Sequence, residues 1–273
     1  MNRDIPFIVF TKYWKTHSLS QLADTLAPLG FDGVELPVRS GFQIEPSCAD
    51  QELYHAQKQL SDAGLPILSV AAPLEEKVFY GCAQAGIEQI RIMFTGQNPK
   101  IPYFQRKKEM QSILSHALFW CRDYGVKIAI QPHYGPGIAQ SMELYDLIKD
   151  YDPQYIGAIW DAGHAGLAGE APEQGLDILW PYLTGINLKS AYYLPSKAAP
   201  SEEILYQPYF TEGREGLCSW NRATQYLRSH IFTGYVCIFA EYTDLSQTLM
   251  LTKKDLLYAR TLMNQTNDSA NSL

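Results

Sequence analysis

The sequence predicts a single α/β domain folded as a (β/α)8 barrel, and three observations favour this fold. Eight short apolar segments rich in Val, Ile and Phe recur along the 273 residues, and each is followed by a helical pattern. Segments 128–130 and 236–239 are apolar on both faces, which is typical of parallel strands covered by helices. No GxGxxG motif follows the first segment, which speaks against a nucleotide cofactor and against the alternative fold, an open doubly wound sheet.

Strands and helices are expected to alternate along the whole chain. The apolar runs predict strands at residues 7–10, 33–36, 67–72, 90–94, 127–132, 156–161, 183–189 and 235–242. The stretches between them predict helices at 18–27, 50–62, 74–84, 104–122, 141–149, 172–180, 219–229 and 246–263. Glycines follow four of these helices, at positions 30, 64, 86 and 125, where a helix end favours a left-handed residue.

We expect residues 1–263 to form the barrel as one domain, because no shift in composition marks a boundary. Residues 264–273 are polar and are expected to form a frayed tail. The N-terminus lacks the features of a signal peptide, and no apolar segment approaches the ~20 residues that span a bilayer. The five cysteines form no CxxC pair. The sequence therefore predicts a cytoplasmic protein with free thiols and no membrane segment.

The charge pattern argues against a nucleic-acid partner. The net charge is -7, and the densest basic run is only residues 106–108, on a predicted helix. A surface that binds phosphates needs a clustered excess of Lys and Arg, which this chain lacks.

Polar residues directly follow or end most of the predicted strands. In a barrel of this kind the chemistry occurs at the carboxyl ends of the strands. We therefore expect these side chains to converge on one mouth of the barrel: Glu35, Gln131, His133, Asp161, Asn187, Lys189 and Glu241.

Several of these residues lie in motifs that resemble those of the xylose-isomerase-like TIM-barrel family. That family holds sugar isomerases and epimerases, inosose dehydratase and endonuclease IV. The sequence GFDGVEL at 30–36 is similar to the family's second-strand motif, and WDAGHA at 160–165 to its sixth-strand D-x-x-H. The remaining likenesses are IQPH at 130–133, INLK at 186–189, EGREGLCSW at 212–220 and FAE at 239–241.

The resemblance implies a divalent metal held by Glu, Asp, His and Glu from strands five to eight. By position these ligands correspond to Gln131, Asp161, Asn187 and Glu241, so two of the four are neutral amides here. Divalent Mn, Mg, Co or Zn prefers anionic oxygen or imidazole nitrogen, and His164 is a further nitrogen candidate. The sequence leaves open whether a metal binds, and predicts looser binding than in relatives.

The resemblance also implies proton transfer beside a carbonyl, using two carboxylates and a metal-stabilised ene-diolate. Glutamine cannot accept and return a proton, so Gln131 removes one of the two bases. Glu241 is the predicted base or metal ligand, and Lys189 is predicted to hold developing negative charge. His133 is the candidate to replace the missing carboxylate, because its ordinary pKa of about 6.5 suits proton transfer.

The candidate substrate contacts are Glu35, Gln131, Asn187, Trp160 and Arg214. Trp160 could stack on a sugar ring, and core packing is the alternative. Arg214 lies in a glycine-flanked loop, and a solvated surface position is its alternative.

The sequence and the resemblance together predict an enzyme of carbohydrate metabolism that resembles sugar isomerases and epimerases. Its expected partner is a small sugar, sugar phosphate or polyol. The alternative is a non-catalytic sugar- or metabolite-binding barrel that has lost the metal. A lyase like inosose dehydratase and a nuclease like endonuclease IV rank behind these, and assembly into a homo-oligomer stays open.

Overall fold

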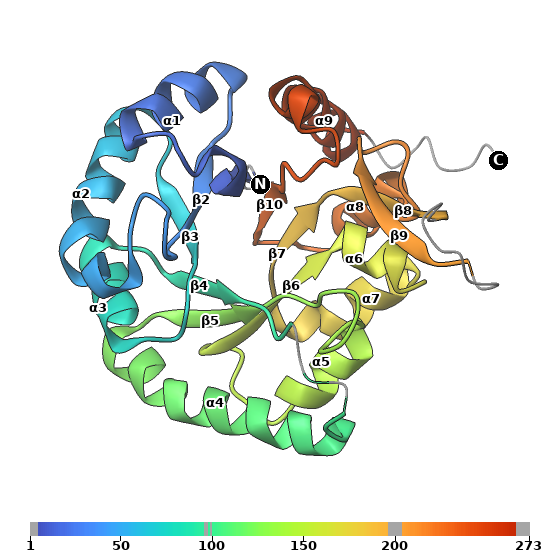
Figure 1. The fold of residues 1–273 in the computed structure, drawn as a ribbon, viewed down its shortest axis with the longest axis horizontal. Helices are drawn as coiled ribbons and strands as arrows, with labels where there is room; N and C mark the ends of the chain where they lie inside the picture. Colours follow the sequence, from blue (N-terminus) through green and yellow to red (C-terminus); the bar gives the residue numbers. More distant parts are fainter. Residues whose placement is uncertain (1–4, 96–97, 99, 196–203, 266–273) are drawn as a thin grey trace.

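Eight parallel strands close a barrel in the computed structural model, which describes residues 5–95, 98, 100–195 and 204–265 (Figure 1). The strands follow one another around the barrel in the order β1-β10-β7-β6-β5-β4-β3-β2. They are β1 (Phe7–Phe10), β2 (Gly33–Pro37), β3 (Ile67–Ala71), β4 (Gln89–Ile92), β5 (Lys127–Ile130), β6 (Ile156–Asp161), β7 (Leu183–Leu188) and β10 (Tyr235–Ile238). Pairing of β1 with β10 closes the sheet, which confirms the (β/α)8 barrel and excludes the open doubly wound sheet.

Helices form a ring outside the strands (Figure 1). They are α1 (Leu19–Leu26), α2 (Ala49–Asp62), α3 (Glu76–Ala85), α4 (Tyr103–Tyr124), α5 (Ser141–Ile148), α6 (Ala162–Leu167), α7 (Pro172–Leu179), α8 (Trp220–Ser229) and α9 (Thr248–Met263). A capping box between Ser18 and Gln21 begins α1. Gly86 and Gly125 end α3 and α4 in the left-handed conformation, as the sequence predicts.

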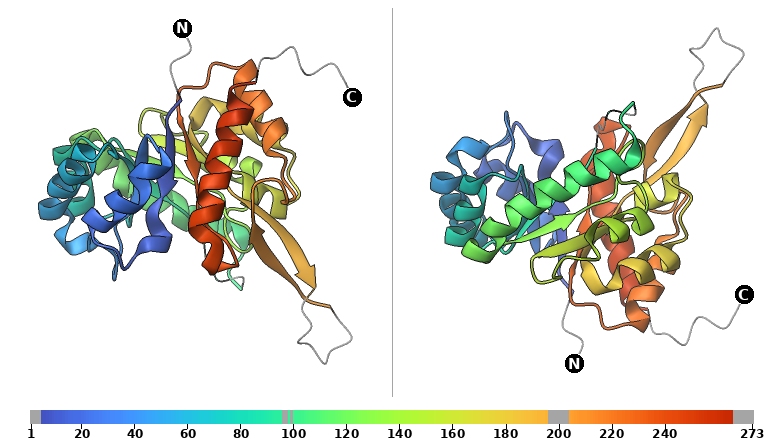
Figure 2. Two further views of the ribbon diagram at one scale, coloured as in Figure 1. Left: turned by 90° about the horizontal axis from the view of Figure 1, so that it is seen from above. Right: turned by 90° about the horizontal axis from the view of Figure 1, so that it is seen from below.

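Three features differ from the expected elements, and the first is α6, a short helix directly after β6 that was not expected. The ladders of β5 and β10 stop at Ile130 and Ile238, so the residues after them lie in loops rather than in the longer strands that were predicted. A second, antiparallel pair of strands, β8 (Ser190–Pro195) and β9 (Tyr206–Thr211), is inserted after β7. Figure 2 shows this β8–β9 hairpin projecting away from the barrel.

The strands separate two apolar clusters. The larger lies between strands and helices, and the smaller fills the barrel interior with residues such as Ile8, Phe10, Cys237 and Phe239. Successive residues of a strand point to opposite faces, so every second side chain faces the interior. Several interior side chains are polar, and they lead from the middle of the barrel to its C-terminal mouth.

Among the described residues, no helix is both long and apolar enough to cross a membrane. The predicted tail at 264–273 lies outside the described residues from position 266 onward. The five cysteines are free, and Cys48 is the one that is not buried.

Candidate functional site

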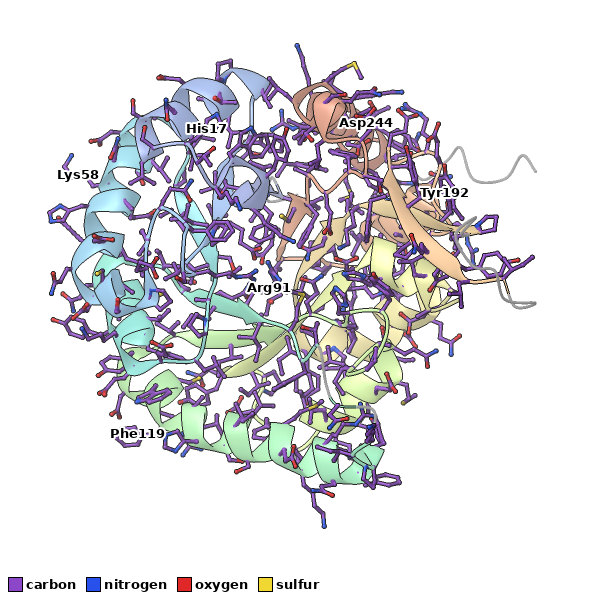
Figure 3. The ribbon with its side chains drawn as sticks, viewed as in Figure 1. His17, Lys58, Arg91, Phe119, Tyr192 and Asp244 are labelled. Atoms are coloured by element: carbon purple, nitrogen blue, oxygen red, sulfur yellow. The ribbon has the colours of Figure 1, made fainter. Side chains whose placement is uncertain are left out.

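Polar side chains from several strands lie together at the C-terminal mouth, the end where chemistry occurs in barrels of this type. Gln131, Asp161, Asn187 and Lys189 are buried there. His133 and Glu241 are half-buried. Figure 3 shows side chains from the surrounding strands pointing toward the centre of the barrel, where Arg91 is labelled.

Glu35 lies deeper in the barrel, in a buried ion pair with Arg91. Arg91 Nη2 donates to Glu35 Oε1 at 2.6 Å, and Nε donates to the same atom at 2.8 Å. Ser69 Oγ donates to Glu35 Oε2 at 3.2 Å. The guanidinium lies over the rings of Phe10 and Phe239, 4.7 and 5.3 Å from their centroids. Glu35 is therefore occupied by protein groups rather than exposed to a substrate.

Arg91 is the residue that the sequence analysis missed. Its strand reads QIRI, in which the two isoleucines lie on the face that packs on the helices. The two-residue period of a strand places Gln89 and Arg91 together on the other face, inside the barrel. This period is the signal that could have identified Arg91.

Arg91 fixes the orientation of the Gln131 amide. Arg91 Nη1 donates to Gln131 Oε1 at 2.8 Å, and Gln131 Nε2 donates to Asp161 Oδ2 at 2.7 Å. A guanidinium has only donors, so the amide oxygen faces Arg91 and the NH₂ group faces Asp161. Gln131 therefore presents hydrogens, not a lone pair, to the acid beside it.

The Lys189 ammonium lies at the centre of the site. Its Nζ donates to Glu241 Oε2 at 2.7 Å and to His164 Nε2 at 2.8 Å. It also lies 3.8 Å from Asp161 Oδ2. The same atom is 4.3 Å from the centroid of the Phe239 ring. One buried cation thus joins Glu241 to Asp161 and His164, which lie three residues apart at the start of α6.

These contacts set the charges of the site. Burial acts to raise the pKa of Glu241, but the ammonium groups of Lys189 and Lys12 together lower it to about 2. Burial raises the pKa of Asp161 to about 6, against the opposing effect of Lys189. Burial and then the Lys189 charge lower the pKa of His164 well below its usual value. His164 is therefore neutral near pH 7 and accepts the hydrogen bond from Lys189.

His133 presents a ring nitrogen at the mouth. Its Nδ1 lies 2.8 Å from the backbone oxygen of Tyr134, and because that oxygen can only accept, Nδ1 carries the proton. Nε2 then holds the lone pair. The His133 and His164 rings lie with centroids 4.0 Å apart. Burial, followed by the charge of Lys189, lowers the pKa of His133. His133 is thus a neutral imidazole that can accept a proton at Nε2.

Two buried polar groups at the mouth lack partners. Asn187 pairs in register with Asp161 on β6, and its amide is near enough to that carboxylate to help lower its pKa, yet neither Oδ1 nor Nδ2 makes a hydrogen bond of good geometry among the described residues. His164 Nδ1 is likewise buried without a partner in that part of the chain. Leaving a buried polar group unpaired costs about 1–3 kcal/mol, so these atoms are suited to receive hydroxyl groups of a ligand.

The backbone is strained directly before Glu241. Ala240 has a φ of 50°, in the left-handed region that residues other than glycine and asparagine seldom occupy. Among the described residues it is the one non-glycine with positive φ. Such outliers persist where surrounding structure enforces them, and here the strain sets the direction in which the chain carries Glu241 into the mouth.

Two of the predicted substrate contacts lie away from this cluster. Trp160 precedes the inward-facing Asp161, so it faces the helices, where its Nε1 donates to Glu170 at 3.3 Å and its ring is buried. Arg214 is exposed, and its guanidinium lies 3.8 Å from the centroid of the Tyr258 ring on α9. The structure gives both residues protein partners outside the mouth.

The residues at the four family ligand positions do not fit a divalent metal. Gln131 turns its NH₂ group toward Asp161, and the Lys189 ammonium lies within contact of both remaining carboxylates. Among the residues that the structure describes, no group of three or more His, Cys, Asp or Glu side chains is arranged to hold a metal ion. A cation would have to displace Lys189 and turn the amide against Arg91.

A cavity of about 640 Å³ opens at the other end of the barrel, beside the first residues of the strands. Its lining includes Pro66, Glu88, Lys127 and Tyr235. We place the candidate site at the C-terminal mouth instead, because charged groups, unpaired polar atoms and backbone strain coincide there.

Comparison with known proteins agrees with this architecture. An inosose dehydratase from Bacillus licheniformis is 23% identical over 263 residues, which cover 88% of this chain and 85% of the relative. The D-psicose 3-epimerase of Clostridium cellulolyticum H10, solved with D-tagatose, matches with a TM-score of 0.71 at 11% identity, over 96% of this chain and 100% of that one. The IOLI protein, solved with a zinc atom, matches with a TM-score of 0.70 at 14% identity, over 94% and 96% of the two chains.

At such identities the solved structures show the fold alone. The family assignment comes from the family model of the xylose isomerase-like TIM barrel, which matches residues 23–260 and so spans most of the sequence. This protein belongs to the xylose isomerase-like TIM barrel family.

Proposed function

We propose that this protein is a dehydratase of keto polyols or keto sugars. It would remove a proton from the carbon beside the carbonyl group and release a hydroxyl group from the next carbon as water. The observation that carries this proposal is His133, a neutral imidazole at the mouth whose Nδ1–H is held by the Tyr134 carbonyl, leaving the Nε2 lone pair to act as a base.

The two carboxylates are poorer candidates for the base. The pKa of about 2 makes Glu241 a weak acceptor of a proton from carbon. Asp161 has a higher pKa, but it is buried and accepts hydrogen bonds from Gln131 and from the backbone of His164. We assign Glu241 a different role: its negative charge stabilises the imidazolium that forms on His133, and its exposed oxygen binds substrate hydroxyl groups.

The steps balance with one acid–base group. His133 Nε2 takes the proton from carbon, and the electron pair of the C–H bond moves toward the carbonyl oxygen to form an enolate. The enolate then expels the neighbouring hydroxyl group, which receives the proton from the His133 imidazolium and leaves as water. The product is an unsaturated ketone, which can tautomerise to a dicarbonyl compound.

Gln131 favours elimination over epimerisation. An epimerase must remove a proton from one face of a carbon and return a proton to the other face, which takes two acid–base groups. Gln131 occupies the position of the second carboxylate and cannot transfer a proton. Likeness to an inosose dehydratase supports the same choice. An isomerase that uses His133 on a single face is the second candidate, because it shares the first step.

The test is proton NMR of the purified protein in deuterated buffer with a panel of inososes and keto sugars. A dehydratase yields a product that has lost water, whereas an isomerase yields a product that keeps all its heavy atoms and has one carbon-bound hydrogen replaced by deuterium. His133→Gln should lower turnover at least about 100-fold, since positioned acid–base groups contribute about 10²–10⁴-fold. His116→Gln is the matched control, because His116 is exposed on α4.

Binding of a keto polyol with neither water loss nor deuterium exchange would support the non-catalytic binder and overturn the proposal. Equal turnover by the wild type and the His133→Gln variant would remove His133 from the mechanism.

A further inference from the structure

The position of Lys189 relative to the two acids suggests a role beyond a general electrostatic aid. We propose that the Lys189 ammonium is the built-in cation of this site, in the place where the family pattern would put a divalent metal, and that the wild-type protein binds no divalent ion between Asp161 and Glu241. The catalytic consequence of this inference rests on the proposed function, but the binding claim does not.

The contacts of Lys189 Nζ are those that a bound metal ion would make. The three atoms around it are a glutamate oxygen at 2.7 Å, an imidazole nitrogen at 2.8 Å and an aspartate oxygen at 3.8 Å. Carboxylate oxygen and imidazole nitrogen are the atoms that ligate divalent metals in proteins. Each of these three potential ligand atoms faces the ammonium, so a metal could bind them only by displacing Lys189 Nζ.

The surroundings hold the ammonium in this position. The Lys189 side chain is buried, and Nζ lies 4.3 and 5.1 Å from the ring centroids of Phe239 and Phe210. Gly163 on α6 makes room for the stem: a Cβ atom there would lie 2.7 Å from Lys189 Cγ. A side chain larger than that of glycine at position 163 would therefore collide with the Lys189 stem.

The two substituted ligand positions also disfavour a divalent metal. Gln131 donates to Asp161, so it stabilises the ionised carboxylate while offering no lone pair to a metal. Asn187 supplies neutral amide atoms where the family pattern has an imidazole. The two carboxylates face two ammonium groups, Lys189 and Lys12, whose Nζ lies 3.6 Å from Glu241 Oε1, so no net negative charge remains to attract a divalent ion. An ion added beside Lys189 would also meet like-charge repulsion.

The catalytic consequence follows from the same charge. An enolate formed at the mouth carries negative charge on oxygen, and a fixed ammonium in a water-poor site can stabilise that oxygen without a metal. The reaction would then run in the presence of a chelator.

The experiment is a calorimetric titration of chelator-treated protein with MnCl₂, together with assays in the presence of EDTA. The wild type should show no stoichiometric binding in the micromolar range, and its activity should be the same with and without EDTA. Tight binding of one Mn²⁺ by the wild type would overturn the proposal if the Glu241→Gln variant loses that binding, because the ion would then lie at Glu241.

A designed variant supplies the positive arm. Gln131→Glu/Asn187→His/Lys189→Ala restores the family ligands and removes the ammonium, so it should bind Mn²⁺ at least about 100-fold more tightly than the wild type. The matched control, Gln131→Glu/Asn187→His/Lys58→Ala, keeps Lys189 and removes an exposed lysine from α2, and it should bind no better than the wild type. Equal tight binding by both variants would show that Lys189 does not occupy the cation position.

Failure of the two proposals can be told apart. A wild type that binds no Mn²⁺ and turns over no keto polyol leaves the cation assignment standing and removes the proposed function. Turnover that EDTA abolishes leaves the dehydratase standing and removes the cation assignment.

Discussion

Arg91 Nη2 lies 2.6 Å from Glu35 Oε1, and both side chains are completely shielded from solvent in the middle of the barrel. Such a pair need not add net stability, since its desolvation is costly. Replacing one residue of the pair lowers the stability strongly, however, because the charge of the other residue is then buried without a partner.

Arg91→Met should therefore lower the free energy of unfolding by about 3–5 kcal/mol, measured by urea denaturation with an unchanged m value. The double variant Arg91→Met/Glu35→Leu should recover a large part of this loss. Arg222→Ala is the control, because its ion pair with Glu173 is exposed and should be worth about 1 kcal/mol or less. Equal costs for the single and double variants would contradict this account of the pair.

The activity should depend on pH through His133. Burial, then the charge of Lys189, lowers the pKa of this imidazole, and a base must be unprotonated to act. We expect kcat/KM to be level near neutrality and to fall with a slope of one only below pH 6.5. A Lys189→Met variant should move this limb to higher pH, because it removes a neighbouring positive charge. If kcat/KM already falls when the pH is lowered from 8 to 7, the acidic limb of the profile belongs to another group.

Stability should depend on pH through Asp255, a buried residue of α9 that has no part in the proposed chemistry. Its carboxylate accepts from Gly213 N and from Tyr242 Oη, each at 2.8 Å, yet burial raises its pKa to about 6. Because the folded pKa lies above the usual 3.8, the stabilisation from proton uptake is complete below about pH 3.8 and is lost as the pH rises through about 6.

The measurement is the difference in unfolding free energy between the wild type and Asp255→Asn, followed from pH 4 to pH 8. The asparagine does not titrate, so the wild type should lose stability relative to the variant as the pH rises across this window. A difference that is constant over the range would show that Asp255 has an ordinary pKa in the folded protein.

Gly163→Ala should lower activity by at least about tenfold while the protein stays folded, because even small misplacements of a positioned group are costly. The added Cβ would collide with the Lys189 stem and move its ammonium. The matched change is Gly175→Ala on α7, whose Cβ would lie 2.6 Å from Trp160 Nε1 and 2.3 Å from Glu170 Oε2.

Gly175→Ala should lower the melting temperature and leave KM unchanged, since Trp160 packs against the helices. A raised KM in this variant would return Trp160 to the substrate site that the sequence analysis assigned to it. Full activity of Gly163→Ala would mean that the lysine can shift without consequence.

The order of strands and helices could be predicted because it depends on local patterns, namely apolar runs and glycines at helix ends such as Gly86 and Gly125. The approach of Asp161 to Glu241 through Lys189 followed from the rule that strands of a barrel end at one mouth. The orientation of the Gln131 amide could not be predicted, because it depends on Arg91 from another strand. The hairpin β8–β9 was not predicted, because its two strands pair only with each other and lie outside the repeated strand–helix units of the barrel.

The pairing of the first strand with the last has a consequence for synthesis of the chain. Phe7 lies in register with Val236, so the sheet cannot close until the segment around Val236, more than 200 residues further along the chain, has left the ribosome. Until then β1 and β7 each present an open edge, and contacts between such distant segments form slowly. Nascent chains of this protein should therefore depend on chaperones for longer than those of proteins whose neighbouring segments are adjacent in sequence.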